Sequence, residues 1–107
     1  MNIQFKKGVL ELCVLSMLLK DDRYGYDLSS KLTEIITISD GTIYPILRRL
    51  KIDGHVTTYL QESSGGPPRK YYQLTDTGRT EQKSLEQEWN HFVGKVESIV
   101  AGGQEDA

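Results

Sequence analysis

The sequence predicts an α+β chain that is mainly α, with three helices, a two-stranded β-hairpin and one long C-terminal helix. Three observations predict this order. Apolar residues recur at helical spacing through the first half of the chain. Beyond Gly54 the period changes to two, and β-branched and aromatic residues stand on both sides of a turn rich in glycine and proline. Apolar residues spaced four and three apart then return over residues 85–99.

The composition indicates one soluble domain. Its 107 residues, 37% hydrophobic and 26% charged, are typical of a globular protein. No apolar run approaches the ~18–20 residues of a membrane span, and the single Cys13 fits a reducing, cytoplasmic setting. The net charge of −2 is uneven, since residues 1–75 hold ten Lys/Arg and eight Asp/Glu while residues 76–107 hold three and seven. The front of the chain can therefore be locally basic.

Residues 4–20 form the first predicted helix, and its apolar side chains lie around most of the circumference. A helix that is apolar nearly all round is buried on more than one side. In a chain this small, the second side is expected to be covered by a partner subunit. The alternative is a central helix buried wholly within the chain.

A second helix is predicted from Tyr24 to Ile36, after a polar turn at residues 21–23, and a tight connection over residues 37–40 leads to the third. The third helix, within residues 39–56, has two faces. Arg48 and Arg49 point away from its apolar stripe, and Thr42 and Tyr44 lie on the flanks. The stripe consists of Ile43, Ile46, Leu47 and Leu50.

The ends of this third helix also have sequence signals. Ser39 or Asp40 is expected to cap its N-terminus, and Gly54 is placed to end it. Pro45 supplies no N–H, so we expect an irregular first turn rather than a broken helix. Such a turn leaves backbone N–H groups pointing outward, where a phosphate can accept them.

Residues 56–74 are predicted to form the hairpin. Strands at residues 56–61 and 69–74 flank a six-residue turn at residues 63–68, which places Arg69 and Lys70 at the hairpin tip. Three helices followed by a hairpin with a basic tip form the winged helix-turn-helix layout, in which the hairpin is the wing.

The last helix is expected to be capped by Thr75 or Asp76, to run to about Val100 and to stop near Gly102-Gly103. Residues 79–84 carry no apolar side chain, so this part is expected to be solvated. The chain divides into a DNA-binding domain, residues 1–75, and a dimerisation helix with a short tail, residues 76–107. The dimerisation seam, expected to meet the first helix of a second subunit, consists of Leu85, Trp89, Phe92, Val96 and Ile99.

Several polar residues are candidates for contact with double-stranded DNA. Arginines can neutralise phosphates or reach guanine edges, and residues near the N-terminus of such a helix meet base edges or phosphate in the major groove. Wing cations are expected at phosphates or in the minor groove. The alternatives are a plain solvated face, a packed Tyr44 and a Ser39 that serves first as a cap. The candidates are Ser39, Thr42, Tyr44, Arg48, Arg49, Arg69 and Lys70.

No constellation of residues predicts catalysis. His55 and His91 are isolated in the sequence, so neither a zinc site nor a catalytic pair is expected. There is no pairing of a nucleophile with a base and no Gly-rich phosphate loop. We expect a protein that is not an enzyme and uses no cofactor or metal.

Three blocks, YGYDL at residues 24–28, GTIYPILRRL at residues 41–50 and RKYYQLTDTG at residues 69–78, occur in a distinctive order. In them the chain resembles the PadR family of bacterial transcriptional regulators. Its short single last helix resembles the compact subfamily, which includes multidrug-sensing members. The resemblance implies a homodimeric repressor on a pseudo-palindromic operator, with the last helix of one subunit against the first helix of the other.

The resemblance also implies a ligand site. Some compact members bind flat aromatic drugs in a pore at the dimer interface, between paired tryptophans. Trp89 stands fourteen residues after the YYQLT block, where those members carry theirs. The alternative is that Trp89 belongs to the core. The residues expected to line the site are Trp89, Phe92, Val93, Val9 and Leu12.

The residue patterns predict a dimeric DNA-binding protein. The resemblance implies that it is a homodimeric transcriptional regulator, a repressor of an adjacent operon that a planar aromatic, phenolic or drug-like ligand releases. Adjacent half-sites would hold the two copies about one DNA turn, ~34 Å, apart. The alternative is a winged-helix protein-interaction module without DNA binding, which the overall acidity permits. DNA binding predicts an affinity that falls steeply with salt, and the alternative predicts a flat response.

Overall fold

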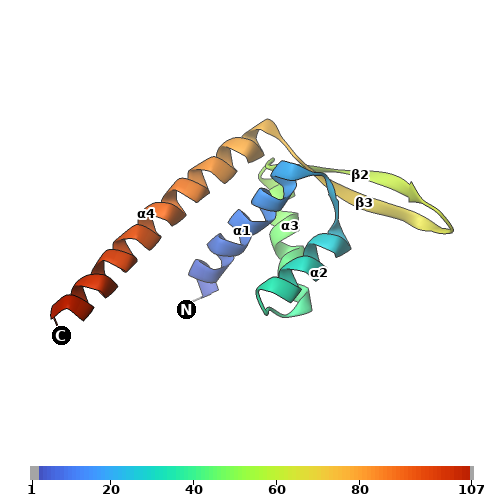
Figure 1. Cartoon of the computed structure of the whole chain (residues 1–107). Helices are drawn as coiled ribbons and strands as arrows, with labels where there is room; N and C mark the ends of the chain where they lie inside the picture. The colour runs from blue at the N-terminus through green and yellow to red at the C-terminus, as the bar shows by residue number, and fades with distance from the viewer. Residues whose placement is uncertain (1–2, 107) are drawn as a thin grey trace.

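The computed structural model describes residues 3–106, and the side chains of residues 8–39 and 41–103. The mainly helical α+β class and the winged helix-turn-helix order are confirmed. In Figure 1 the elements follow the chain as α1 (Ile3–Lys20), β1 (Arg23–Tyr24), α2 (Gly25–Ile35), the 3₁₀ turn η1 (Asp40–Thr42), α3 (Ile43–Ile52), β2 (Val56–Ser63), β3 (Gly66–Leu74) and α4 (Asp76–Asp106).

The strand β1 is not predicted by the sequence. It pairs antiparallel with β3, Arg23 with Tyr72 and Tyr24 with Tyr71, so the sheet has three strands in the order β1-β3-β2 instead of two. The sequence predicts a polar turn through Arg23 and a helix from Tyr24, whereas α2 begins one residue later. Two residues are too few to show a period of two, so this strand is defined by its partner rather than by its own sequence.

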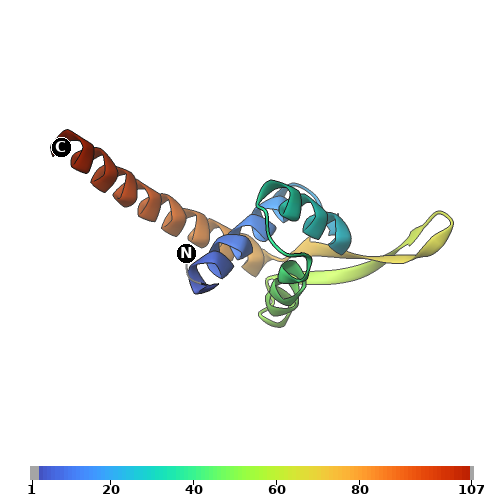
Figure 2. The same cartoon turned by 90° about the horizontal axis from the view of Figure 1, so that it is seen from below.

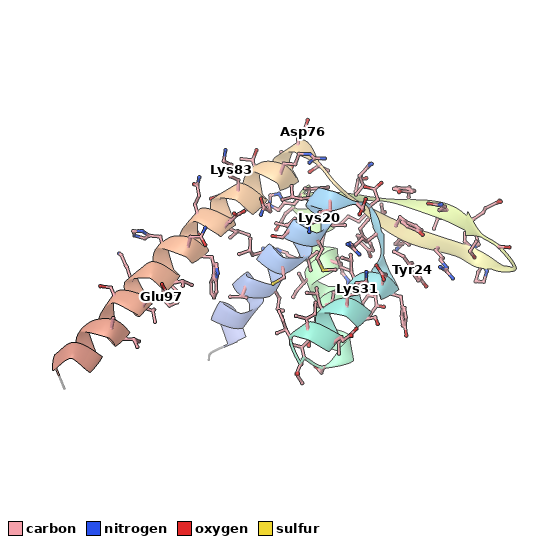
Figure 3. All side chains as sticks on the ribbon, in the orientation of Figure 1. Lys20, Tyr24, Lys31, Asp76, Lys83 and Glu97 are labelled. Carbon is pink, nitrogen blue, oxygen red and sulfur yellow. The ribbon has the colours of Figure 1, made fainter. Side chains whose placement is uncertain are left out.

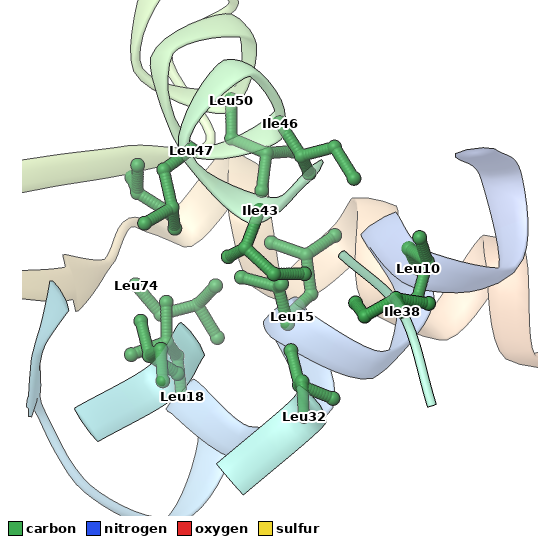
Figure 4. Close-up of a cluster of buried hydrophobic side chains, with 13 residues drawn as sticks. Leu10, Leu15, Leu18, Leu32, Ile38, Ile43, Ile46, Leu47, Leu50 and Leu74 are labelled. Atoms are coloured by element: carbon green, nitrogen blue, oxygen red, sulfur yellow. The ribbon is translucent and has the colours of Figure 1, made fainter. Parts of the chain in front are cut away.

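The hydrophobic core lies where α1, α2 and α3 meet the root of the wing (Figure 4). Every residue of the predicted stripe on α3 is buried, which confirms the orientation of that helix. Fully burying a Leu or Ile side chain contributes about 1.5–3 kcal/mol, so this stripe fixes the orientation of the opposite, polar face. The core residues are Leu10, Val14, Leu15, Leu18, Leu28, Leu32, Ile38, Ile43, Ile46, Leu47, Leu50, Val56 and Leu74.

The irregular start of α3 is confirmed. A 3₁₀ turn precedes the helix, and Pro45 is the third residue of α3, where a missing N–H removes no intrahelical hydrogen bond. The predicted cap is wrong for Ser39, because its hydroxyl lies 2.8 Å from that of Thr42 and caps no backbone N–H. The side chain of Asp40 lies outside the described residues.

The end of α3 is the one predicted. Gly54 has φ +79°, and its N–H donates to the Lys51 carbonyl at 3.1 Å. The next N–H, of His55, donates to the Leu50 carbonyl at 2.9 Å. Both bonds together form a Schellman motif, in which a left-handed glycine closes the helix. The helix α3 therefore passes into β2 through a turn whose backbone groups are hydrogen-bonded.

The start of α4 is tied to that same turn. The Thr75 hydroxyl accepts the Gly78 N–H at 3.0 Å, which confirms the predicted cap, and it lies 2.6 Å from the Gly54 carbonyl, to which it donates. Thr77 donates a second hydroxyl to the Gly54 carbonyl at 2.7 Å. The first turn of α4 is therefore hydrogen-bonded to the end of α3.

The wing is longer and its turn tighter than predicted. Ser63 pairs directly with Gly66, and Gly65 between them has φ +76°. The six-residue turn is therefore wrong, because Pro67 and Pro68 belong to β3 at an irregularity of the ladder, where a missing N–H is tolerated. The basic residues predicted at the tip lie further back, Arg69 opposite Gln61 and Lys70 opposite Leu60.

The expectations for α4 are met only in part. Arg79, Thr80, Lys83 and Ser84 are exposed as expected, but Gln82 is buried against α1 and donates to the Ser16 hydroxyl at 3.2 Å. The helix does not stop near Gly102-Gly103 but continues to Asp106. Glycine ends a helix by taking a positive φ, and neither of these glycines does so.

The molecule is elongated, measuring 62 × 28 × 22 Å. The C-terminal half of α4 and the wing project from the helical body in opposite directions, as Figures 1 and 2 show from two sides. Within residues 3–106, no helix is long and apolar enough to cross a membrane. The body thus holds α3 beside the root of the wing and leaves the far end of α4 extended.

Candidate nucleic-acid interface

The outward face of α3 carries the polar residues expected from the sequence. Tyr44, Arg48 and Arg49 are exposed there, and Thr42 is half-buried just before the helix. Arg49 Nε donates to Asp53 Oδ2 at 3.3 Å, within the same helix and its C-cap. An exposed i,i+4 pair of this kind contributes only about 0.3–0.5 kcal/mol. The guanidinium can therefore exchange this carboxylate for a phosphate at small cost.

Tyr72 of β3 joins the wing to this helix. A Cβ atom added to Gly25 would lie 3.0 Å from Tyr72 Cε1 and 4.0 Å from Tyr44 Cε1, so both rings lie against the start of α2. Burial raises the pKa of Tyr72 above its ordinary value, with Tyr44 adding to the rise and the positive charge of Arg48 opposing it. A methyl group at Gly25 would press against the Tyr72 ring, so the lack of a Cβ lets β3 approach the start of α2 closely.

The opposite face of the sheet carries a row of three tyrosines, one from each strand. Tyr24 pairs with Tyr71 across β1 and β3, and Tyr71 pairs with Tyr59 across β3 and β2. The ring centroids of Tyr59 and Tyr71 are 5.7 Å apart and stacked, and those of Tyr24 and Tyr71 are 6.1 Å apart and tilted. Aromatic cross-strand pairs of this kind stabilise a sheet by roughly 0.2–1 kcal/mol each. Figure 3 labels Tyr24 between α2 and the wing.

Arg69 lies on the tyrosine face of the wing. Its Cζ atom is 5.1 Å from the centroid of the Tyr24 ring, a cation–π contact. The residue borders a shallow cleft whose other lining residues are aromatic or charged, with three aspartates and Arg23, which pairs with Asp27 at 3.2 Å. The cleft is lined by Asp21, Asp22, Arg23, Tyr24, Tyr26, Asp27, Arg69 and Tyr71. Carboxylates around the guanidinium oppose its positive charge, so this arginine contributes less field to a polyanion than an isolated one.

Asp22 holds both long strands of the wing. Its Oδ2 atom accepts the Tyr59 hydroxyl at 2.7 Å and the Gln73 side-chain amide at 3.2 Å. The hydrogen bond to this carboxylate raises the pKa of Tyr59, because the bond favours the protonated phenol. Asp22 lies in the connection between α1 and β1, so these bonds link the wing to the helical body.

The structure thus brings most of the predicted DNA residues of α3 together on one surface and places Arg69 on the other face of the wing. Thr42, Tyr44, Arg48 and Arg49 belong to one surface, with the exposed Ser39 at its edge. Lys70 is exposed on β3, on the strand face opposite to Arg69. Sequence reasoning missed Asp22, Tyr59 and Tyr72. Residue alternation could have assigned Tyr71 and Tyr72 to opposite faces, but no local signal identifies Asp22 as the hydrogen-bond partner of Tyr59 and Gln73.

A second concave site lies between α1 and α4. Its volume is about 250 Å³, and it is lined by Gly8, Val9, Leu12, Leu85, Glu88, Trp89 and Phe92. Of the residues predicted to line a ligand site, Val93 alone is absent from this lining. The apolar walls and the Glu88 carboxyl would suit an apolar ligand with one polar or cationic group.

Two further features bear on chemistry. In the part of the chain that the structure describes, no group of three or more His, Cys, Asp or Glu side chains could hold a metal ion. His55 instead pairs with Glu81, its Nε2 atom lying 3.4 Å from the Glu81 carboxylate. That contact joins the start of β2 to α4 and belongs to the framework rather than to a site.

Comparison with known proteins identifies one family. The family model described as "Transcriptional regulator PadR-like family" matches residues 14–84. A sequence relative of uncharacterised function from Lysinibacillus sphaericus is 31% identical over 100 residues, covering 90% of this chain and 92% of the relative.

Solved structures give the same result. A Streptococcus transcriptional regulator is 40% identical, covers 92% of this chain and 98% of its own, and superposes with a TM-score of 0.82. A PadR-like transcriptional regulator from Bacillus cereus is 37% identical, with 91% and 96% covered and a TM-score of 0.80. A PadR-like transcription factor from Bacteroides fragilis is 40% identical, with 90% and 94% covered and a TM-score of 0.75.

Proposed function

The chain belongs to the PadR-like family of transcriptional regulators, and on this basis we propose that it is a homodimeric repressor of a pseudo-palindromic operator. The family makes it a DNA-binding regulator. One observation carries the assignment of the surface: α3 buries its whole apolar stripe and turns Tyr44, Arg48 and Arg49 to solvent. A helix with this division can enter a major groove while its core face stays packed.

In the proposed complex, α3 lies in the major groove and the wing lies along the neighbouring backbone. Thr42 and Tyr44 meet base edges or phosphate near the helix start, and Arg48 and Arg49 bind phosphates or guanine edges. Ser39 lies at the edge of this surface and contacts the backbone. Residues 1–75 would thus bind DNA, and residues 76–107 would form the dimer.

The test is to titrate the protein into a labelled duplex from the region upstream of its own gene. Binding is measured by fluorescence anisotropy at several salt concentrations. We expect the logarithm of affinity to fall linearly with the logarithm of salt concentration, with a slope near 0.9 per neutralised phosphate. Arg48→Ala should weaken binding by about 1–3 kcal/mol if it reads a guanine. Lys83→Ala, which removes an exposed charge from α4, is the matched control and should bind normally.

A winged-helix protein-interaction module would give a different result. It would bind no duplex fragment specifically, and its affinity for its partner would not follow the counterion-release line. If Arg48→Ala binds the duplex as tightly as the wild type, the proposal that α3 contacts DNA is wrong. Repression itself is measured by a reporter fused to the same upstream region, whose expression should rise when the gene is deleted.

Dimerisation is proposed through α1 and the C-terminal half of α4. Val96, Ile99 and Val100 are exposed on α4, Ile99 to 74% of its surface. Val96 and Ile99 continue the row from Leu85 at heptad spacing, and Val100 lies beside them. Together they form an apolar stripe on the part of α4 that extends beyond the helical body. Apolar stripes of this width are covered in solution, and a second copy presents the same stripe.

The cavity between α1 and α4 is proposed to bind a planar aromatic ligand that releases the repressor. Trp89 lines it together with Phe92, and Leu12 lies on the α1 side. Since Trp89 is the only tryptophan of the chain, its fluorescence reports on this cavity, and the titration is run at a protein concentration where the oligomeric state does not change. Titration with a panel of planar aromatic compounds should quench that fluorescence along a saturating curve. A panel without quenching would eliminate the ligand site but leave DNA binding intact.

A further inference from the structure

We infer that the two faces of the wing have different roles: Lys70 on one face contacts DNA, while Arg69 on the other is a positioning residue that holds the wing against the body. The inference rests on the proposed function and refines it. The sequence places two adjacent cations on the wing, and nothing in their residue types predicts different roles. Their different surroundings in the structure are what distinguish them.

The strand register assigns the faces. Side chains alternate along β3, so Lys70, Tyr72 and the buried Leu74 share one face. Tyr72 lies beside Tyr44 and Arg48 of α3. Lys70 is two residues further along the same face, about 6.6 Å toward the tip. Lys70 therefore lies on the side of the wing that faces the α3 surface, and its exposed ammonium can extend the basic row of that helix toward a phosphate.

Arg69 has the opposite orientation. It shares its face with Tyr71 and the tyrosine row, and its guanidinium lies over the Tyr24 ring at 5.1 Å. The cleft around it contains the carboxylates of Asp21, Asp22 and Asp27. A planar guanidinium stacks on an aromatic ring better than an ammonium does. Arg69 is exposed, as Lys70 is, but its guanidinium is held over a ring of β1, the strand that follows α1.

Asp22 completes the same attachment. It accepts hydrogen bonds from Tyr59 on β2 and Gln73 on β3, so one carboxylate fixes both strands to the α1–β1 connection. Together, the Arg69–Tyr24 contact, the tyrosine row and Asp22 set the angle of the wing to α3. A wing held at one angle does not lose conformational freedom when it meets the DNA backbone, which favours binding.

The first experiment measures the salt slope for a mixed-sequence duplex of about 30 base pairs, since counterion release does not depend on sequence. Lys70→Gln should lower the slope by about 0.9 for each wing in contact. Arg69→Gln should weaken binding but leave the slope at the wild-type value. Arg69→Lys keeps the charge and loses the planar stack, so it should weaken binding as Arg69→Gln does.

The second experiment follows hydrogen exchange of the wing amides, residues 56–63, 66 and 69–74, in the protein without DNA. Arg69→Gln and Asp22→Asn should each speed exchange there several-fold, while α1 and α3 exchange at wild-type rates. Lys70→Gln should leave wing exchange unchanged. This readout would not move in this local way if the variants merely lowered global stability.

The outcomes separate the two proposals. A smaller salt slope for Arg69→Gln, with no change for Lys70→Gln, would overturn the inference. Wing exchange that stays at the wild-type rate in both Arg69→Gln and Asp22→Asn would also overturn it. A wild-type protein that binds no duplex at any salt would refute the proposed function, and with it the DNA role of Lys70, while the exchange data would still decide the positioning role of Arg69.

Discussion

Tyr59 shows how a single exposed hydroxyl can matter to the shape of this protein. Only the phenol, and not the phenolate, can donate the 2.7 Å bond to Asp22, so ionisation would place two negative charges together. That is why the pKa of Tyr59 is raised. The neighbouring Tyr71 stacks on the same ring without taking part in the bond.

The pH dependence of this bond follows from the direction of the shift. The folded-state pKa of Tyr59 lies above the unfolded value of ~10, so its contribution is fully present below pH ~10 and is lost as pH rises through the raised pKa. We expect wing hydrogen exchange, corrected for its intrinsic pH dependence, to be steady through the neutral range and to speed up only in strong alkali. Tyr59→Phe should exchange faster at every pH. A wild-type wing that loosens near pH 8 would contradict this account.

At the scale of the elements, α4 packs so closely against the start of β2 that the contact leaves no room for a side chain at Gly78. Gly78 is buried in the first turn of α4, and a Cβ atom there would overlap the carbonyl oxygen of His55 and lie 2.8 Å from Leu74 Cδ1. A backbone oxygen cannot rotate away as a side chain can. The helix and the start of β2 are therefore as close as two backbones allow.

Gly78→Ala should destabilise the protein by about 1–3 kcal/mol, because helix and strand must separate to admit the methyl group. Gly94→Ala is the matched control. Its Cβ meets nothing within 4 Å, and replacing a helical glycine by alanine should stabilise by about 0.5–1 kcal/mol. Urea unfolding of both variants measures the difference. If the two variants have equal free energies of unfolding, the close approach of α4 and β2 at Gly78 does not contribute to stability.

The elements also show which parts of this fold are readable from the sequence. The α3 stripe, its Gly54 stop and the Thr75 cap are local patterns with strong physical causes, and each is confirmed. The tight wing turn was missed because Pro67-Pro68 reads as a turn, whereas a ladder irregularity accepts both. The burial of Gln82 could not be read locally, since it depends on Ser16, which is 66 residues away.

In the candidate interface, too, the local features could be predicted from the sequence and the non-local ones could not. The exposed face of α3 is the complement of its buried stripe, so the sequence was enough to predict it. The separation of Arg69 from Lys70 needs the register of β3 against β1 as well as β2. Adjacent strand residues always alternate, but only the partner strand shows which face Tyr24 occupies.

At the scale of the whole molecule, the elongated shape is consistent with the proposed dimer. The radius of gyration is 16.6 Å, whereas a compact domain of about 100 residues has one near 13 Å. The excess comes from the wing and from the far half of α4, and the apolar stripe on that half includes Ile99. An extended helix with such a stripe is stable when a second surface covers it.

We expect sedimentation to give twice the mass of one chain for the wild type and the mass of a single chain for Ile99→Glu, because a carboxylate buried without a partner opposes association. Gln87→Glu adds the same charge to an exposed position away from the stripe and should remain dimeric. If Ile99→Glu is still a dimer, the dimer interface does not include Ile99.

The two threonine hydroxyls on the Gly54 carbonyl have a mechanical consequence. They fasten the root of α4 to the one turn that closes α3, at 2.6 and 2.7 Å, and the His55 carbonyl accepts the Thr75 N–H at 3.1 Å. The root of the long helix and the end of α3 are therefore joined at a single point. If α4 pivots there, a displacement of its far end becomes a much smaller displacement at α3, because α3 lies next to the pivot.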